Sequence, residues 1–227
     1  VAANYAGNDE AAKATADELG IHVYKFDVAD YDAVGAGIAA IEKDLGPIDI
    51  VVNNAGVTRD APFHKMTKDQ WQQVIDIDLT SAFNVTRQVW DGMRERSWGR
   101  VINTASAHAL VASPFKSAYV AAKHGIAGLT KTVALEVAQS GITVNAICPG
   151  YVWTPLVEAQ IPDTMKARGM SREEVIDQVL LAKQDEQTSL LRLNTPALDL
   201  AEFDITGPKL SGIIDSQNTT DTFSLPD

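Results

Sequence analysis

Short apolar runs of the strand type alternate with longer helical runs through most of this 227-residue sequence. The strand runs are nearly continuous in apolar residues, which is typical of parallel strands that are buried on both faces. Such alternation predicts an α/β fold, a doubly wound parallel sheet with right-handed crossovers and helices on both faces. We expect strands at residues 1–5, 21–28, 48–56, 100–106 and 141–150, and helices at 8–20, 30–46, 67–96 and from 117 onward.

The charge balance and the cysteine content limit the partners. The sequence has 30 acidic and 19 basic residues and a formal net charge of −11, the opposite of what a nucleic-acid backbone attracts. No apolar run approaches the roughly 18 residues of a membrane span, and no signal segment opens the sequence. The single cysteine, Cys148, excludes an internal disulfide and a cysteine-ligated metal, and its apolar surroundings predict a core residue. We expect a cytoplasmic protein that acts on a small molecule, without nucleic acid, membrane or metal.

Small and polar residues follow several of the predicted strands, where they meet at one edge of the sheet. They are Asp27 and Val28, then Asn53, Asn54, Ala55 and Gly56, then Ser106, and finally Pro149 and Gly150. Ligands of such sheets bind beyond the carboxyl ends of the strands. Any one of these groups would fit an ordinary turn, but together they predict a binding site at that edge.

Tyr119 and Lys123 stand four residues apart in a helical run, so their side chains share one face of the helix. Ser106 ends the strand that precedes this helix. A free phenol titrates near about 10, and a neighbouring cation shifts that value towards the operating pH of a general base. A serine hydroxyl can donate to an oxygen that gains charge in the transition state. These three groups predict proton transfer to or from an alcohol oxygen.

The motifs NNAG at 53–56, Ser106, Y-x-x-x-K at 119–123 and PG at 149–150 stand in an order and spacing that resemble the short-chain dehydrogenase/reductase family. The resemblance covers roughly residues 1–182 and implies a Rossmann-like domain that uses NAD or NADP to oxidise a secondary alcohol or reduce a ketone. It implies that Tyr119 is the general acid/base, that Ser106 holds the substrate oxygen, and that Lys123 binds the nicotinamide ribose. The cofactor contacts that it implies are Asp27, Val28, Asn54, Ala55, Gly56, Tyr119, Lys123, Pro149, Gly150, Val152 and Thr154.

Two groups within that family resemble different parts of the sequence. Roughly the first hundred residues are similar to acetoacetyl-CoA reductases, and residues 105–181 are similar to D-3-hydroxybutyrate dehydrogenases. The second similarity implies that His108, Lys116 and Gln160 hold a small carboxylate substrate, with Tyr151 where tryptophan is common. Ammonium and imidazole N–H groups are suitable partners for a carboxylate. A free 3-hydroxy acid, best 3-hydroxybutyrate and its product acetoacetate, is therefore the first expectation, and a 3-oxoacyl-CoA is the alternative.

The sequence departs from the family at its phosphate-binding loop. The usual first strand and the glycine-rich loop that cradles pyrophosphate at a helix N-terminus are absent. That strand would lie in the middle of the sheet, and its loss would leave the backbone groups of two strands unpaired or force them to pair again. The sequence is then either N-terminally incomplete or poor at binding a dinucleotide, and a catalytically impaired or non-enzymatic relative is the alternative of another class.

Three further features distinguish this sequence from the family pattern. Asp78 stands where the family carries a catalytic asparagine, and we expect it either to pair with Lys123 or to be an ordinary helix charge. Asn4 and Tyr5 stand at the position where a carboxylate would bind the ribose of NAD. The lack of a carboxylate there favours NADP, whereas the dehydrogenase-like half of the sequence implies NAD. Residues 183–227 are divergent and polar towards their end and predict a loose segment outside the domain at 1–182. In the family this region builds an edge strand and a subunit interface, so the divergent segment gives no ground to assume a tetramer, and the resemblance alone leaves a homo-oligomer as an expectation.

Overall fold

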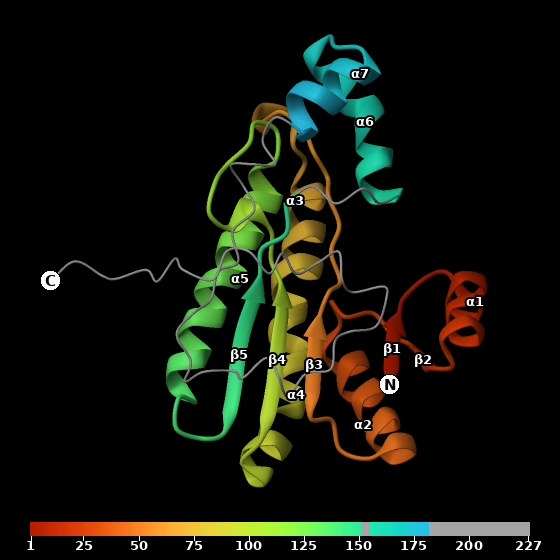
Figure 1. The fold of residues 1–227 in the computed structure, drawn as a ribbon, viewed down its shortest axis with the longest axis vertical. Coiled ribbons are helices and arrows are strands. Elements are labelled where there is room, and N and C mark those ends of the chain that lie inside the picture. Colours follow the sequence, from red (N-terminus) through yellow and green to blue (C-terminus); the bar gives the residue numbers. More distant parts are fainter. Residues whose placement is uncertain (151–154, 182–227) are drawn as a thin grey trace, which may run out of the picture.

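A computed structural model describes residues 1–150 and 155–181 and divides the strands between two parallel sheets (Figure 1). The smaller sheet pairs β1 (Ala2–Tyr5) with β2 (His22–Lys25). The larger has the order β3 (Ile50–Asn53), β4 (Gly99–Thr104) and β5 (Ile142–Ile147). The prediction of a parallel α/β fold is confirmed, and the predicted segment at 183–227 lies outside the described residues.

Helices connect the strands in the predicted alternation. They are α1 (Asp9–Leu19), α2 (Tyr31–Leu45), α3 (Lys68–Ile75), α4 (Ser81–Arg96), α5 (Ser117–Glu136), α6 (Pro155–Arg168) and α7 (Arg172–Val175), with single turns at Phe63–Lys65 and Ala107–Ala109. A π-helical turn, Asp76–Thr80, joins α3 to α4, and a second, Ile176–Leu181, follows α7. Among these described helices, none is both long enough and apolar enough to cross a membrane.

Side-chain caps begin three helices at the positions where the sequence predicted that helices start. Asn8 accepts the N–H of Ala11 at 2.9 Å at the start of α1. Asp30 caps α2, and Thr67 opens α3 with a reciprocal capping box to Gln70. Such caps satisfy N–H groups that have no partner in the first turn of a helix. Gly20 ends α1 with a left-handed φ of 65°, as a C-terminal glycine is expected to do.

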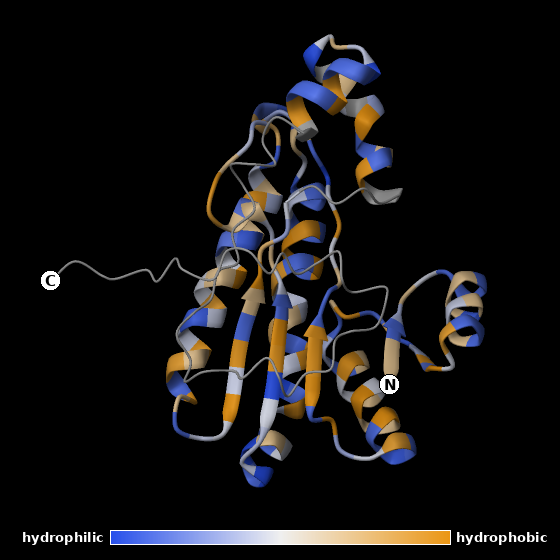
Figure 2. Cartoon of the chain, viewed as in Figure 1, coloured by the Kyte–Doolittle hydropathy of each residue, from blue (hydrophilic) through white to orange (hydrophobic). Residues whose placement is uncertain are grey.

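The main core lies between the larger sheet and the helices on one of its faces. Alternate residues of the strands, including Val51, Val101 and Val144, pack against side chains of α2, α4 and α5. Figure 1 shows α4 behind β3 and β4, and Figure 2 shows the apolar residues that run along β3 and β5. Burial of this apolar surface is the main force that holds the helices on the sheet.

The opposite face of the larger sheet is open within the described part of the chain. Two apolar residues of β3 on that face, Ile50 and Val52, are 45% and 58% exposed. For the larger sheet, the expectation of helices on both faces is therefore met on one face only within residues 1–150 and 155–181. The smaller sheet with α1 stands beside β3 without a strand between them (Figure 1), which agrees with the expectation that a missing strand leaves two edges unpaired.

The turn before β5 depends on a glycine, and we predict that Gly141→Ala destabilises the protein. Gly141 has a φ of 75°, and an added Cβ would lie 2.0 Å from the backbone oxygen of Ser97. Left-handed strain and this contact with backbone should cost about 2 kcal/mol or more, measured by urea unfolding. The control is Gly128→Ala on the exposed side of α5, where no atom lies within 4 Å of an added Cβ. It should stabilise the helix by about 0.5–1 kcal/mol, and equal losses for the two variants would contradict the prediction.

Candidate active site

Ser106 and His108 are buried side by side just beyond the carboxyl end of β4. The backbone N–H of His108 donates to Ser106 Oγ at 3.1 Å, because Ser106 caps the short turn that follows the strand. The Nδ1 atom of the same imidazole lies 3.3 Å from Ser106 Oγ, and its Nε2 atom lies 2.9 Å from Ser113 Oγ. In the tautomer with Nδ1 protonated, the backbone N–H and the Nδ1–H of His108 both donate to Ser106 Oγ. The hydroxyl proton of Ser106 is then available for another acceptor.

Tyr119 lies in the first turn of α5 and is surrounded by this imidazole and two ammonium groups. The rings of His108 and Tyr119 meet edge to face with centroids 5.8 Å apart. The Nζ atoms of Lys116 and Lys123 lie 5.7 Å and 5.4 Å from the centroid of the phenol ring. The prediction that Tyr119 and Lys123 share one helix face is confirmed. Ammonium groups at these distances are attracted to the face of the ring by cation–π interaction.

Lys123 is only 4% exposed and forms an ion pair with an equally buried carboxylate. Its Nζ atom donates to the carbonyl oxygen of Thr104 at 3.0 Å and lies 3.3 Å from Asp78 Oδ2. The other oxygen of Asp78 accepts the N–H of Val57 at 2.7 Å. The expected pairing of Asp78 with Lys123 is confirmed, and its interpretation as an ordinary helix charge is wrong, because Asp78 is 2% exposed in the π-helical turn.

Burial raises the pKa of the Asp78 carboxyl above its ordinary value. The positive charge of Lys123 and the N–H of Val57 act in the opposite direction but do not cancel the desolvation. Gly56 lies against the same pair, because a Cβ there would be 3.1 Å from Asp78 Oδ2 and 3.7 Å from Lys123 Nζ. A side chain at position 56 would therefore press on the ion pair, which gives this glycine of the NNAG motif a physical reason.

Apart from Tyr119 and Lys123 on α5, the predicted cofactor residues that the structure describes follow the carboxyl ends of the strands. Asn54, Ala55 and Gly56 are exposed after β3, and the carbonyl of Pro149 after β5 accepts the N–H of Ala107, next to Ser106, at 2.9 Å. No atom lies within 4 Å of an added Cβ on Gly150. Val152 and Thr154, and the predicted substrate residue Tyr151, lie outside the described residues.

In the loop after β2, the predicted cofactor residues Asp27 and Val28 form hydrogen bonds within the protein itself. Asp27 Oδ1 accepts the N–H of Ala29 at 2.9 Å and so shapes its own turn. The carbonyl of Val28 accepts a hydrogen bond at 3.0 Å from Asn84, a buried residue of α4 that the sequence did not single out. Asn4, at the end of β1, donates to the carbonyl of Phe26 at 2.7 Å. This network holds the carboxyl ends of β1 and β2 close to α4.

Lys116 and Gln160, both predicted to hold the substrate, come together at a pocket near His108 and Tyr119. Lys116 Nζ donates to Gln160 Oε1 at 3.2 Å and forms a close ion pair with Asp60. Ser113, which bonds to His108, lines the same pocket. Sequence reasoning missed Asp60 and Ser113. Asp60 is one loop carboxylate among many and lies 56 positions from Lys116, so that no local pattern indicates the pair.

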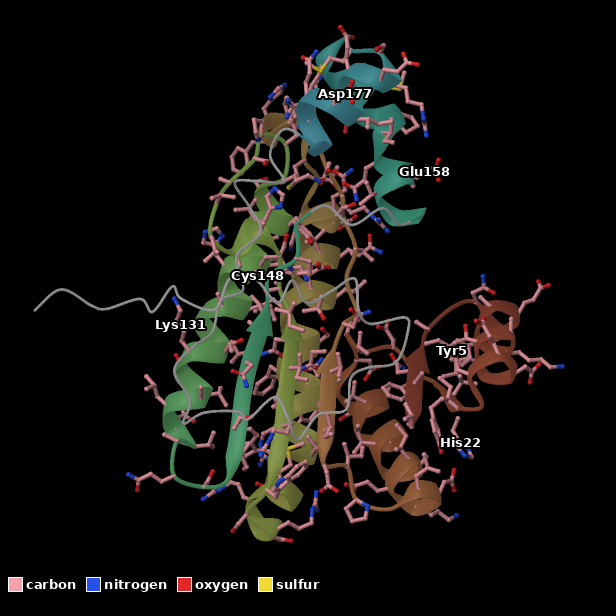
Figure 3. The ribbon with its side chains drawn as sticks, viewed as in Figure 1. Tyr5, His22, Lys131, Cys148, Glu158 and Asp177 are labelled. Carbon is pink, nitrogen blue, oxygen red and sulfur yellow. The ribbon has the colours of Figure 1, made fainter. Side chains whose placement is uncertain are left out.

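Cys148 lies in the middle of the molecule, beyond the end of β5 (Figure 3). It is buried with Ala105, Ile126 and Ala146 in a second apolar cluster. The prediction of a core residue is confirmed. The cluster helps to fix the position of Ser106, since it includes Ala105, the residue immediately before the serine.

A parallel α/β fold with a serine, a tyrosine and a lysine gathered beyond the carboxyl ends of its strands is typical of a Rossmann-like protein. A family model described as short chain dehydrogenase matches residues 1–164. The chain therefore belongs to the short-chain dehydrogenase family.

Several similar relatives have one of two names. The chain is 57% identical to an acetoacetyl-CoA reductase of Paracoccus denitrificans over 159 residues, which cover 70% of this chain and 66% of the relative. It is 50% identical to an acetoacetyl-CoA reductase of Shinella zoogloeoides over 212 residues, covering 93% and 85%. It is 51% identical to a D-beta-hydroxybutyrate dehydrogenase of Rhizobium meliloti over 181 residues, covering 77% and 69%.

Among solved structures, the chain is similar to an actinorhodin polyketide ketoreductase with NADPH. The TM-score is 0.75 at 34% identity, over 79% of this chain and 71% of the other. A gluconate 5-dehydrogenase from Burkholderia cenocepacia in complex with NADP and tartrate gives a TM-score of 0.66 at 33% identity, over 70% and 64%. Both comparisons agree with the family and with the parallel fold.

The buried carboxyl of Asp78 generates a prediction about stability and pH. Because its pKa is raised in the folded state, its contribution is fully present below the ordinary value of about 4 and is lost as the pH rises through the raised pKa. Asparagine stays neutral and can still accept the N–H of Val57. We expect the free energy of unfolding of Asp78→Asn, relative to the parent chain, to increase as the pH rises from about 4 to about 8.

Urea unfolding at several pH values measures this difference. Lys123 does not obscure it, because below pH 4 the protonated Asp78 also leaves the ammonium without a charged partner. The control is Asp17→Asn on the exposed side of α1, which should show no comparable trend. A difference that stays flat or decreases with pH for the Asp78 variant would contradict the assigned direction.

Proposed function

We propose that this chain is a nicotinamide-dependent oxidoreductase that interconverts a 3-hydroxyacyl group and its 3-oxo form. The observation that carries the proposal is the convergence of Ser106, His108 and Lys123 around the ring of Tyr119. The relatives named acetoacetyl-CoA reductase and D-beta-hydroxybutyrate dehydrogenase support this substrate class. Two kinds of substrate fit this proposal. One is a free 3-hydroxy acid such as 3-hydroxybutyrate, and the other is a CoA thioester such as acetoacetyl-CoA.

Each residue has a role that follows from its surroundings. Tyr119 takes the proton of the substrate hydroxyl during oxidation and returns it during reduction, as a general acid/base held beside His108 and the two lysines. Ser106 accepts from His108 and donates its own proton to the substrate oxygen as charge develops there. The nicotinamide, when bound, supplies or accepts the hydride.

The residues at the nicotinamide end of the site fit such a cofactor. An ammonium has three N–H donors, and Thr104 and Asp78 account for two of those of Lys123 within the described part of the chain. The third can donate to a ribose hydroxyl. Asn4 and Tyr5 at the end of β1 offer no carboxylate to an adenosine ribose, which favours NADP, and the two similar solved structures are described with NADPH and with NADP.

A second candidate, a relative without efficient catalysis, is favoured by one observation. Residues 1–150 and 155–181 contain no glycine-rich loop that joins a strand to a helix N-terminus, and the sheet is divided between β1 and β3. Cofactor titration separates the two candidates, because a ligand that binds the folded state raises the melting temperature. No rise with millimolar NADH or NADPH would favour the second candidate and count against the oxidoreductase.

The role of Tyr119 is tested by removing its hydroxyl. We predict that Tyr119→Phe lowers kcat about 100- to 10,000-fold, the usual contribution of a general acid/base, with acetoacetate or acetoacetyl-CoA as substrate. The shift of melting temperature with NADPH should remain, because the ring and Lys123 stay in place. Tyr24→Phe is the matched control, since that phenol bonds Asp44 at 3.1 Å on the surface, and it should keep full turnover. Undiminished turnover in Tyr119→Phe would remove Tyr119 from its role.

A further inference from the structure

We infer that Asp60 decides the charge of the substrate: by pairing with Lys116 it makes the pocket accept an uncharged acyl group, such as a thioester, in preference to a free carboxylate. The inference rests on the proposed oxidoreductase function and names its substrate class. It departs from the expectation raised by the sequence, in which Lys116 was a partner for a carboxylate.

The position of Lys116 makes its charge important for the substrate. It is the residue immediately before α5, and its Nζ atom lies 5.7 Å from the centroid of the Tyr119 ring. The part of a substrate that lies next to the reacting carbon therefore lies near Lys116. In a 3-hydroxyacyl compound the carboxylate or the thioester carbonyl is separated from the reacting carbon by one methylene group, so it lies within reach of the same ammonium.

The ammonium of Lys116 already has a negative partner. Asp60 pairs with it directly, and Gln160 accepts a second hydrogen bond at 3.2 Å. The side chains of Lys116 and Asp60 are only 12% and 28% exposed, so that water screens the pair less than it screens a surface pair. An incoming carboxylate would have to share the ammonium with Asp60 and would meet its negative charge.

A thioester carbonyl does not meet that repulsion. Lys116 has one N–H donor beyond those directed at Asp60 and Gln160 among the described contacts. A neutral carbonyl oxygen can accept it without adding a charge to the pocket. The other polar groups that line the pocket, Ser113 and Thr164, are neutral, and the further cation, Arg168, is exposed to solvent. The paired centre beside Tyr119 thus presents hydrogen bonds without net charge.

The substitution Asp60→Asn tests this inference, because it removes the charge and leaves Lys116 free to bind a carboxylate. The measurement is the ratio of kcat/KM for acetoacetate to kcat/KM for acetoacetyl-CoA, both with NADPH. We expect the ratio to rise about tenfold or more, as befits a hydrogen bond between charged groups. An unchanged or lower ratio would overturn the inference. Asp60→Ser serves the same purpose if the asparagine variant fails to fold.

Asp49→Asn is the matched control. Asp49 forms a comparable ion pair with Arg96 at 3.0 Å, but just before the amino end of β3, away from the pocket. Its loss removes one carboxylate and one ion pair and should leave the ratio as it is in the parent chain. A rise in both variants would assign the effect to net charge and overturn the role of Asp60.

A binding measurement separates this inference from the proposed function. Sodium D-3-hydroxybutyrate is titrated against the parent chain and Asp60→Asn at equal ionic strength, and the melting temperature is followed. Greater stabilisation of the variant supports the role of Asp60, and equal stabilisation overturns it. If the parent chain reduces neither acetoacetate nor acetoacetyl-CoA, the proposed function fails, and this comparison still decides the charge selectivity of the pocket.

Discussion

The buried contact between Lys123 and Asp78 is the interaction on which the site depends. An ammonium and a carboxylate taken out of water are costly unless they are paired and hydrogen-bonded. Here the pair is supported by the Thr104 carbonyl at the end of β4 and by the Val57 N–H after β3. The contact therefore joins two strand ends, the π-helical turn of the long helix, and α5. Tyr119 is positioned because its helix is held by this pair at one end of the sheet.

A second constraint is the division of the sheet. The strands of both sheets are short, and the face of the larger sheet that carries Ile50 and Val52 is open within the described residues. Even so, the active-site end is well organised, because the core between β3–β5 and helices α2, α4 and α5 lies on the other face. Ser106, Tyr119 and Lys123 all belong to this part of the molecule, since they follow β4 or lie on α5. The half that would hold the phosphates of a dinucleotide is the less complete one.

Much of the fold and of the site could be predicted from local sequence. Asn8, Asp30 and Thr67 cap helices because their side chains bond to N–H groups only a few residues away. Tyr119 and Lys123 share a face because the helix has a period of 3.6 residues. Helices α6 and α7, which carry Gln160 and line the pocket, were not predicted. Their short apolar clusters, such as Ile161 with Val175 and Val179, become a core only when the two helices pack.

The sequence by itself determined the alternation of strands and helices, the edge of the sheet where polar groups meet, and the chemical equipment of Ser106, Tyr119 and Lys123. These follow from periodicity and from the side chains themselves. Only the tertiary structure decided which charged side chains pair with one another and how far they are buried. Asp78 is buried against Lys123, and Asp60 occupies Lys116 from a loop 56 positions away. The strength of a charge pair depends on distance and on exclusion of water, and the folded chain alone establishes both.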